Sequence, residues 1–294
     1  MASWKSYYEL TKPNVVWLII FTAIVGMMLS VPGMIPIQAL VFGSLGIGLA
    51  AASAAVVNHL VDQKIDAEMG RTEGRPLPTG QIDNIQAGSL ALILGIISML
   101  VLVFLVNWLT AILTFLSLIG YAFVYTMYLK RATPQNIVIG GAAGAAPPVL
   151  GWTAVTGEVH GHALLLFLII FIWTPPHFWA LAVAKKDEYA RAKIPMLPVT
   201  HGVAYTRLHI LLYTILLFAV TMLPFAVGMS GLLYFLGVLV LNCIFLYYAI
   251  ALMSPEADEK LAMRTFSYSI LYLMILFALL LFDHYIPVIY SLFA

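Results

Sequence analysis

The sequence predicts an all-α, polytopic membrane protein, a bundle of nine transmembrane helices. Of its 294 residues, 63% are hydrophobic and only 9% are charged, whereas soluble domains carry roughly 25% charged residues. The apolar runs are continuous rather than alternating, which excludes a transmembrane β-barrel. The composition also excludes a soluble globular fold and a disordered chain, and the single cysteine, Cys243, excludes a disulfide scaffold.

Each predicted helix is an apolar run bounded by charged residues, proline or glycine. A helix that crosses about 30 Å of hydrocarbon needs roughly 20 apolar residues. In chain order, the runs cover residues 14–34, 36–58, 86–106, 108–129, 136–156, 163–184, 207–228, 231–253 and 266–282. We expect residues 1–294 to form one transmembrane domain.

The N-terminal run indicates the type of membrane. It is too long for the core of a signal peptide and has no obvious small-residue cleavage site, so we expect it to be retained. The segment before it, residues 1–13, leaves no room for a transit peptide rich in Arg and Ser. Both observations favour the plasma (inner) membrane of a prokaryote.

The basic residues predict the orientation. With nine spans, all 14 Lys and Arg residues fall in the loops on the N-terminal side, and of the 13 acids only Glu158 and Asp283 fall on the other side. The positive-inside rule therefore predicts a cytoplasmic N-terminus. One span more or fewer would scatter the basic residues over both sides, so their distribution supports the count. The net charge of +1 gives no indication of a nucleic-acid partner.

Two cytoplasmic loops, residues 59–85 and 185–206, are long enough to predict a function. At the first, Asn58, Asp62 and Asp66 follow one another at intervals of four residues, so they lie on one face of a helix over about 12 Å. Such a row of oxygen atoms suits Mg²⁺, which proteins hold with one or two carboxylates and substrate phosphates. The alternative is a solvated helix end whose acids pair with nearby basic residues.

Several basic residues flank these acids. Arg71 and Arg75 are suited to forked hydrogen bonds with phosphate oxygens. Lys130 and Arg131, at the inner end of the fourth span, are also candidates for binding phosphate oxygens. The alternative for all four is contact with lipid headgroups or topology alone. In the second loop, the alternative for Asp187 is an ion pair with a residue four positions later.

His177 is an ionisable residue within the sixth apolar span. Such residues are rare in spans and are candidates for function. We expect the preceding Pro175 and Pro176 to break the helix and to open space beside the imidazole. The alternative is an imidazole that makes an ordinary hydrogen bond between helices.

The motifs resemble those of the UbiA superfamily of intramembrane prenyltransferases. The similarity lies in Asn-x-x-x-Asp-x-x-x-Asp at 58–66, in Arg-x-x-x-Arg-Pro-Leu-Pro at 71–78, and in a second acidic loop after the sixth span. Four further segments are similar to the members that farnesylate heme b. They are Thr-Pro-Pro-His-Phe-Trp at 174–179, Asp-Glu-Tyr-Ala-Arg at 187–191, Ile-Pro-Met-Leu-Pro at 194–198 and the Gly/Ala-rich run 140–148. The resemblance covers about residues 5–290.

The resemblance implies transfer of a farnesyl group from farnesyl diphosphate to the 2-vinyl group of heme b, with addition of water, to give heme O and diphosphate. Mg²⁺ would be the cofactor, and heme b a substrate within the lipid bilayer. The expected metal ligands are Asn58, Asp62, Asp66 and Asp187, of which the three aspartates are also the expected catalytic residues. The expected diphosphate-binding residues are Asn58, Arg71, Arg75, Lys130 and Lys186, and His177 is the expected heme-binding residue, since imidazole is a common ligand of heme iron.

One departure from the superfamily concerns the second loop. Quinone-type members commonly repeat Asp-x-x-x-Asp there, whereas position 191 of this chain is arginine. Two arrangements stay open: Asp187 acts together with Glu188, or Asp187 acts alone while basic residues hold the phosphate. The prenyl chain needs an apolar channel, and aromatic residues of spans four to six are candidates to line it: Phe115, Tyr121, Phe123 and Tyr125. The alternative for each is ordinary packing between helices.

Other functions are weighed against this one. The nearest alternative is a prenyltransferase that acts on a quinone or chlorophyll precursor. A secondary transporter would also have broken helices, but its polar residues lie near the midplane of the bilayer rather than at its cytoplasmic edge. A non-catalytic heme-binding assembly factor would not need the acidic and basic loops. Docking of a downstream heme-modifying enzyme, or a role in terminal oxidase assembly, stays open.

Overall fold

The computed structural model describes residues 3–68, 70 and 72–293, with the side chains of these residues up to 286. In this part of the chain every regular element is helical, which confirms the predicted all-α class. Eight of the described helical segments are long and apolar enough to cross a membrane, and a bent pair of helices makes a ninth. This pair consists of α1 (Trp4–Leu10) and α2 (Pro13–Leu29), which are inclined by 52°.

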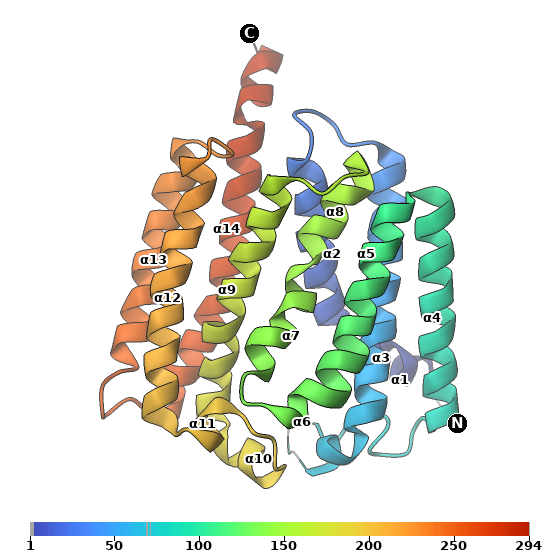
Figure 1. The fold of residues 1–294 in the computed structure, drawn as a ribbon, viewed down its shortest axis with the longest axis vertical. Helices are drawn as coiled ribbons and strands as arrows, with labels where there is room; N and C mark the ends of the chain where they lie inside the picture. The colour runs from blue at the N-terminus through green and yellow to red at the C-terminus, as the bar shows by residue number, and fades with distance from the viewer. Residues whose placement is uncertain (1–2, 69, 71, 294) are drawn as a thin grey trace.

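The spans stand side by side as one bundle (Figure 1). After α2 they are η1 (Ala39–Gly43) with α3 (Ser44–Glu68), α4 (Asn84–Leu105), α5 (Trp108–Ile119) with the π-helical segment η2 (Gly120–Leu129) and α6 (Lys130–Ala132), α7 (Asn136–Ala145) with α8 (Pro147–Thr156), α9 (Gly161–Ala184), α12 (Val203–Ala226), α13 (Leu232–Ala251) and α14 (Glu259–Phe293). Two short helices, α10 (Lys186–Arg191) and α11 (Leu197–Thr200), lie between α9 and α12.

The second span is longer than the sequence predicts. The expected end was residue 58, but α3 continues to Glu68. Neither glycine nor proline occurs between residues 59 and 68, so nothing in this stretch ends the helix. The first predicted loop is therefore helical for ten residues, and the acidic side chains are fixed by a regular backbone.

Prolines act differently in two places. Pro147 begins α8 and divides the predicted span 136–156, because proline has no N–H to donate along the helix. By contrast, α9 runs without interruption through Pro175 and Pro176, so the prediction of a break there is wrong. Both prolines are buried against neighbouring helices, and such packing lets transmembrane helices tolerate proline.

Two glycines bring α2 and α8 into direct backbone contact. A Cβ atom on Gly26 would lie 2.1 Å from the carbonyl oxygen of Pro148, and one on Gly151 would lie 1.9 Å from that of Ala23. No side chain fits at either position. This close packing fixes α2, whose first residue follows directly on the bend at Lys12.

The polar connections lie at one end of the bundle. In Figure 1, α1, α6, α10 and α11 gather there with the loop that follows α3, while the end of α14 projects from the opposite end. The fold therefore brings both acidic segments predicted from the sequence to the same end of the bundle.

Candidate active site

Helix α3 presents three polar side chains inside the bundle. Asn58, Asp62 and Asp66 are 5%, 2% and 4% exposed. The Asn58 amide donates a hydrogen bond of 2.8 Å to Asp62 Oδ2 and a longer one of 3.4 Å to Thr126 Oγ1 of η2. These residues are therefore not a solvated helix end, although the ion pair that this alternative expects between Asp66 and Arg75 is present.

Three cations from different parts of the chain converge on these side chains. Lys130 Nζ lies 2.5 Å from Asp62 Oδ2, and Arg75 donates a hydrogen bond of 2.7 Å to Asp66 Oδ2. Lys12 Nζ donates to Asn58 Oδ1. Among the predicted site residues, the structure thus brings together Asn58, Asp62, Asp66, Arg75 and Lys130. Arg71 lies outside the described residues.

Sequence analysis missed the role of Lys12, which it used only to predict orientation. The residue occupies the bend between α1 and α2 with a left-handed backbone, φ 50°. This conformation ends α1, and Pro13, whose ring restricts φ, starts α2. The available signal was a lysine beside a helix-starting proline at the same membrane face as the acidic loops.

His59 is a second residue that sequence analysis left unassigned. It is 2% exposed, and its Nδ1 lies 3.7 Å from Asp66 Oδ2. Neither of its buried ring nitrogens makes a hydrogen bond. His59 therefore lies next to the carboxylate that Arg75 pairs with.

The oxygens on α3 fit a hard divalent cation that is also bound by a substrate. Asp62 Oδ1 is buried and makes no hydrogen bond, so one carboxylate oxygen stays available. Among the described residues, no three His, Cys, Asp or Glu side chains lie close enough together to hold a metal ion by themselves. The protein oxygens would thus supply part of a Mg²⁺ coordination sphere and substrate phosphate the rest, which is the usual arrangement for this ion.

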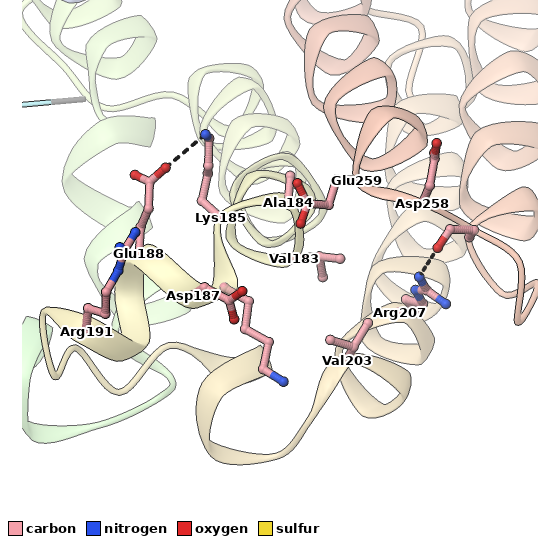
Figure 2. Close-up of a pocket in the computed structure, with 12 residues that line it drawn as sticks. Val183, Ala184, Lys185, Asp187, Glu188, Arg191, Val203, Arg207, Asp258 and Glu259 are labelled. Atoms are coloured by element: carbon pink, nitrogen blue, oxygen red, sulfur yellow. Dashed lines mark hydrogen bonds and ion pairs between the residues drawn. The ribbon is translucent and has the colours of Figure 1, made fainter. Parts of the chain in front are cut away.

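The second acidic segment is α10, and its two acids point in different directions (Figure 2). The exposed Asp187 points toward Val203 and Arg207 of α12, in a cavity of about 510 Å³ whose lining contains no residue of α3. Glu188 points away from α12, and its Oε1 accepts a hydrogen bond of 2.9 Å from Lys185. Its Oε2 is buried and makes no hydrogen bond. Lys186 lines the same cavity as Asp187.

Two tyrosines of η2 lie beside the α3 cluster. The rings of Tyr121 and Tyr125 stack with centroids 5.5 Å apart, and η2 packs against α3, where Thr126 accepts a hydrogen bond from Asn58. A Cβ on Gly140 would lie 2.1 Å from the Tyr125 ring, so this glycine of α7 leaves the space that the ring fills. The other two aromatic candidates, Phe115 and Phe123, are each 48% exposed and face outward.

His177 is enclosed by aromatic rings. Its imidazole stacks on Trp173 at 4.2 Å and on Phe266 of α14 at 4.6 Å, measured between ring centroids. Its Nδ1 lies 2.6 Å from Ser269 Oγ. Because α9 is continuous through Pro175 and Pro176, the expected break beside the imidazole does not occur. Among the described residues, Nε2 has no hydrogen-bond partner.

The sequence is similar to those of known prenyltransferases. Residues 19–271 match the model of the UbiA prenyltransferase family. The protoheme IX farnesyltransferase of Methylococcus capsulatus is 62% identical over 97% of this chain and 95% of its own length. The enzyme of the same name from Nitrosococcus oceani is 61% identical over 98% of this chain and 96% of its own length.

Solved structures share the fold. A structure of digeranylgeranylglyceryl phosphate synthase superimposes with a TM-score of 0.81 over 97% of this chain and 99% of its own, at 19% identity. A UbiA homologue from Archaeoglobus fulgidus bound to DMAPP and Mg²⁺ gives a TM-score of 0.63 over 94% of this chain and 99% of its own, at 16% identity. With a family model that spans most of the sequence and relatives of this similarity, the chain belongs to the UbiA prenyltransferase family and is a membrane-embedded prenyltransferase.

Proposed function

We propose that this prenyltransferase joins the farnesyl group of farnesyl diphosphate to the 2-vinyl group of heme b, with addition of water, and releases heme O and diphosphate. This proposal rests on the cluster of buried oxygens on α3. Three basic residues surround these oxygens: Lys12 contacts Asn58, Arg75 contacts Asp66, and Lys130 contacts Asp62. Such a site suits an anionic leaving group bound together with a cation.

The reaction begins at the allylic diphosphate. The bond between C1 of the farnesyl group and the diphosphate oxygen breaks, and both electrons leave with the diphosphate. Lys12, Arg75 and Lys130 would stabilise the charge that develops on the leaving oxygens. Bound Mg²⁺, held by the α3 oxygens, would neutralise further negative charge. The tyrosine rings of η2 would face the allylic cation and stabilise it by cation–π attraction.

The acceptor then supplies the electrons for the new bond. The terminal carbon of the vinyl group bonds to farnesyl C1, and the cation left next to the porphyrin ring is captured by water, which loses a proton to solvent. No nucleophilic side chain is required. The names of the relatives favour heme b over a quinone precursor, and in this proposal His177 binds the heme.

We place the chain in the plasma (inner) membrane of a bacterium, with the α3 cluster at the cytoplasmic face. The named relatives are bacterial, and the basic residues fall on this side. In this orientation, the polar site opens to the compartment that supplies diphosphate esters and Mg²⁺.

The test supplies the purified chain with Mg²⁺, heme b and farnesyl diphosphate. We expect a heavier and more hydrophobic heme on chromatography, together with one diphosphate per heme. Asp62→Asn, as the control for the site, should remove this product while the protein stays folded. An unchanged heme together with a prenylated quinone or chlorophyll precursor in parallel assays would overturn the assignment of heme b as the acceptor. Heme binding without any transfer would instead support an assembly factor.

A further inference from the structure

Ser269 of α14 joins His177 to the main chain through a single hydroxyl group. The residue is 0% exposed. Its Oγ lies 2.6 Å from His177 Nδ1 and also 2.6 Å from the carbonyl oxygen of Phe266. Both distances are short enough to require a hydrogen atom between the two heavy atoms.

Counting hydrogens assigns the direction of both bonds. A carbonyl oxygen can only accept, so the one hydroxyl hydrogen of Ser269 lies toward Phe266. The hydroxyl oxygen must therefore accept from His177, and Nδ1 must carry a hydrogen. A neutral imidazole has one N–H, so Nε2 keeps an unshared electron pair.

We propose that Ser269 is a positioning residue that holds His177 in the Nδ1–H tautomer and thereby presents Nε2 as a ligand for the heme iron. The proposal rests on the heme-binding role given to His177 above. Histidine ligands of metals almost always donate their other N–H to a fixed acceptor, which sets the tautomer and raises the basicity of the ligating nitrogen. The chain from His177 through Ser269 to the Phe266 carbonyl is such an acceptor.

Neighbouring contacts fix the ring in place. Trp173 and Phe266 stack on the imidazole, with ring planes inclined to it by 17° and 26°. Trp173 Nε1 also donates a hydrogen bond of 2.8 Å to the carbonyl oxygen of Ser269. The same two helices, α9 and α14, thus hold both the plane of the ring and the acceptor for its Nδ1–H.

A first measurement tests the tautomer without heme. In ¹⁵N-histidine-labelled protein, the His177 signals are assigned by their loss in His177→Ala. We expect a protonated Nδ1 and an unprotonated Nε2 in the neutral form. In Ser269→Ala the two tautomers should mix, and Ser269→Thr should restore the original pattern. A protonated Nε2 in the unaltered chain would overturn the proposal whatever the protein does with heme.

A second measurement tests whether His177 is a ligand of the heme iron. Heme b is titrated into the full chain without farnesyl diphosphate, and the absorption spectrum and the iron–histidine stretching band are recorded. Ser269→Ala should weaken heme binding by roughly 10-fold or more and shift the band, and Ser269→Thr should restore both. The matched control is Ser98→Ala, since Ser98 is equally buried and donates a 2.6 Å hydrogen bond from α4 to Gly46 of α3.

The outcomes separate the two proposals. If His177→Ala changes the heme spectrum but Ser269→Ala does not, Ser269 only joins the helices and the inference is wrong. If His177→Ala leaves the spectrum unchanged, the heme-binding role of His177 fails, and the inference fails with it. In that case the farnesylation assay still decides the reaction independently.

Discussion

At the scale of single residues, the half-buried Lys12 gives the first prediction. Replacing it in Lys12→Met removes a charged donor from the Asn58 amide oxygen and from the proposed diphosphate site. Hydrogen bonds to charged groups are worth about 1.5–3 kcal/mol, so we expect KM for farnesyl diphosphate to rise by roughly 10- to 100-fold. The measurement is steady-state kinetics at saturating heme b. The control is Lys5→Met, because Lys5 is an exposed lysine of α1. An unaltered KM in Lys12→Met would show that Lys12 does not belong to the diphosphate site.

The two neighbouring acids of α10 give a second prediction. Glu188 has a buried oxygen that makes no hydrogen bond, whereas Asp187 is exposed. A buried carboxylate oxygen without a partner is costly unless a bound cation compensates it. We expect Glu188→Gln to lower kcat/KM by about 10²-fold, and Asp187→Asn to have at least tenfold less effect. Parallel kinetics of both variants decides between them, and a larger loss in Asp187→Asn would favour the assignment made from sequence.

The site residues that could be predicted from the sequence are those that lie on one face of the same helix. Asn58, Asp62 and Asp66 share one helical face because of their spacing, and the sequence predicts this without knowledge of the fold. Lys12 reaches Asn58 across 46 positions, through the bend before α2. Which neighbours Asp187 and Glu188 each face likewise depends on how α10 packs, so neither fact is visible in the motif.

At the scale of elements, the contact between α2 and α8 gives a third prediction. Alanine at Gly26 or Gly151 would put a methyl group into a backbone carbonyl. Overpacking of this kind typically costs about 1–3 kcal/mol, so Gly26→Ala and Gly151→Ala should lower the thermal midpoint of the purified protein in detergent. The control is Gly88→Ala on α4, where nothing lies within 4 Å of the added atom. Equal midpoints for Gly26→Ala and the unaltered chain would contradict the close contact.

Hydropathy predicted where the spans lie but not how each is built. The same residue pair, Pro-Pro, begins α8 at Pro147 and lies inside the continuous α9 at Pro175. A single sequence does not reveal this difference, since both proline pairs are buried. In the same way, the end of α3 at Glu68 depends on polar residues that a hydropathy window counts as loop.

At the scale of the whole molecule, the few charges predicted the arrangement best. Because all 14 basic residues map to one side of nine spans, the sequence alone gathered both acidic loops at one end, and the fold agrees (Figure 1). It could not predict which side chains would line a cavity there. The structure places Asp187 and Lys186 in a cavity whose lining contains no residue of α3.

The bend at Lys12 has a practical consequence for handling the protein. The short helix α1 carries the chain into the site, and Ser6 holds it there by donating a hydrogen bond of 2.9 Å to Gln81 in the loop after α3. A change that displaces α1 would therefore act close to Lys12 of the proposed diphosphate site. The end of α14 projects from the opposite end of the bundle (Figure 1), which makes the C-terminus the better place for a tag.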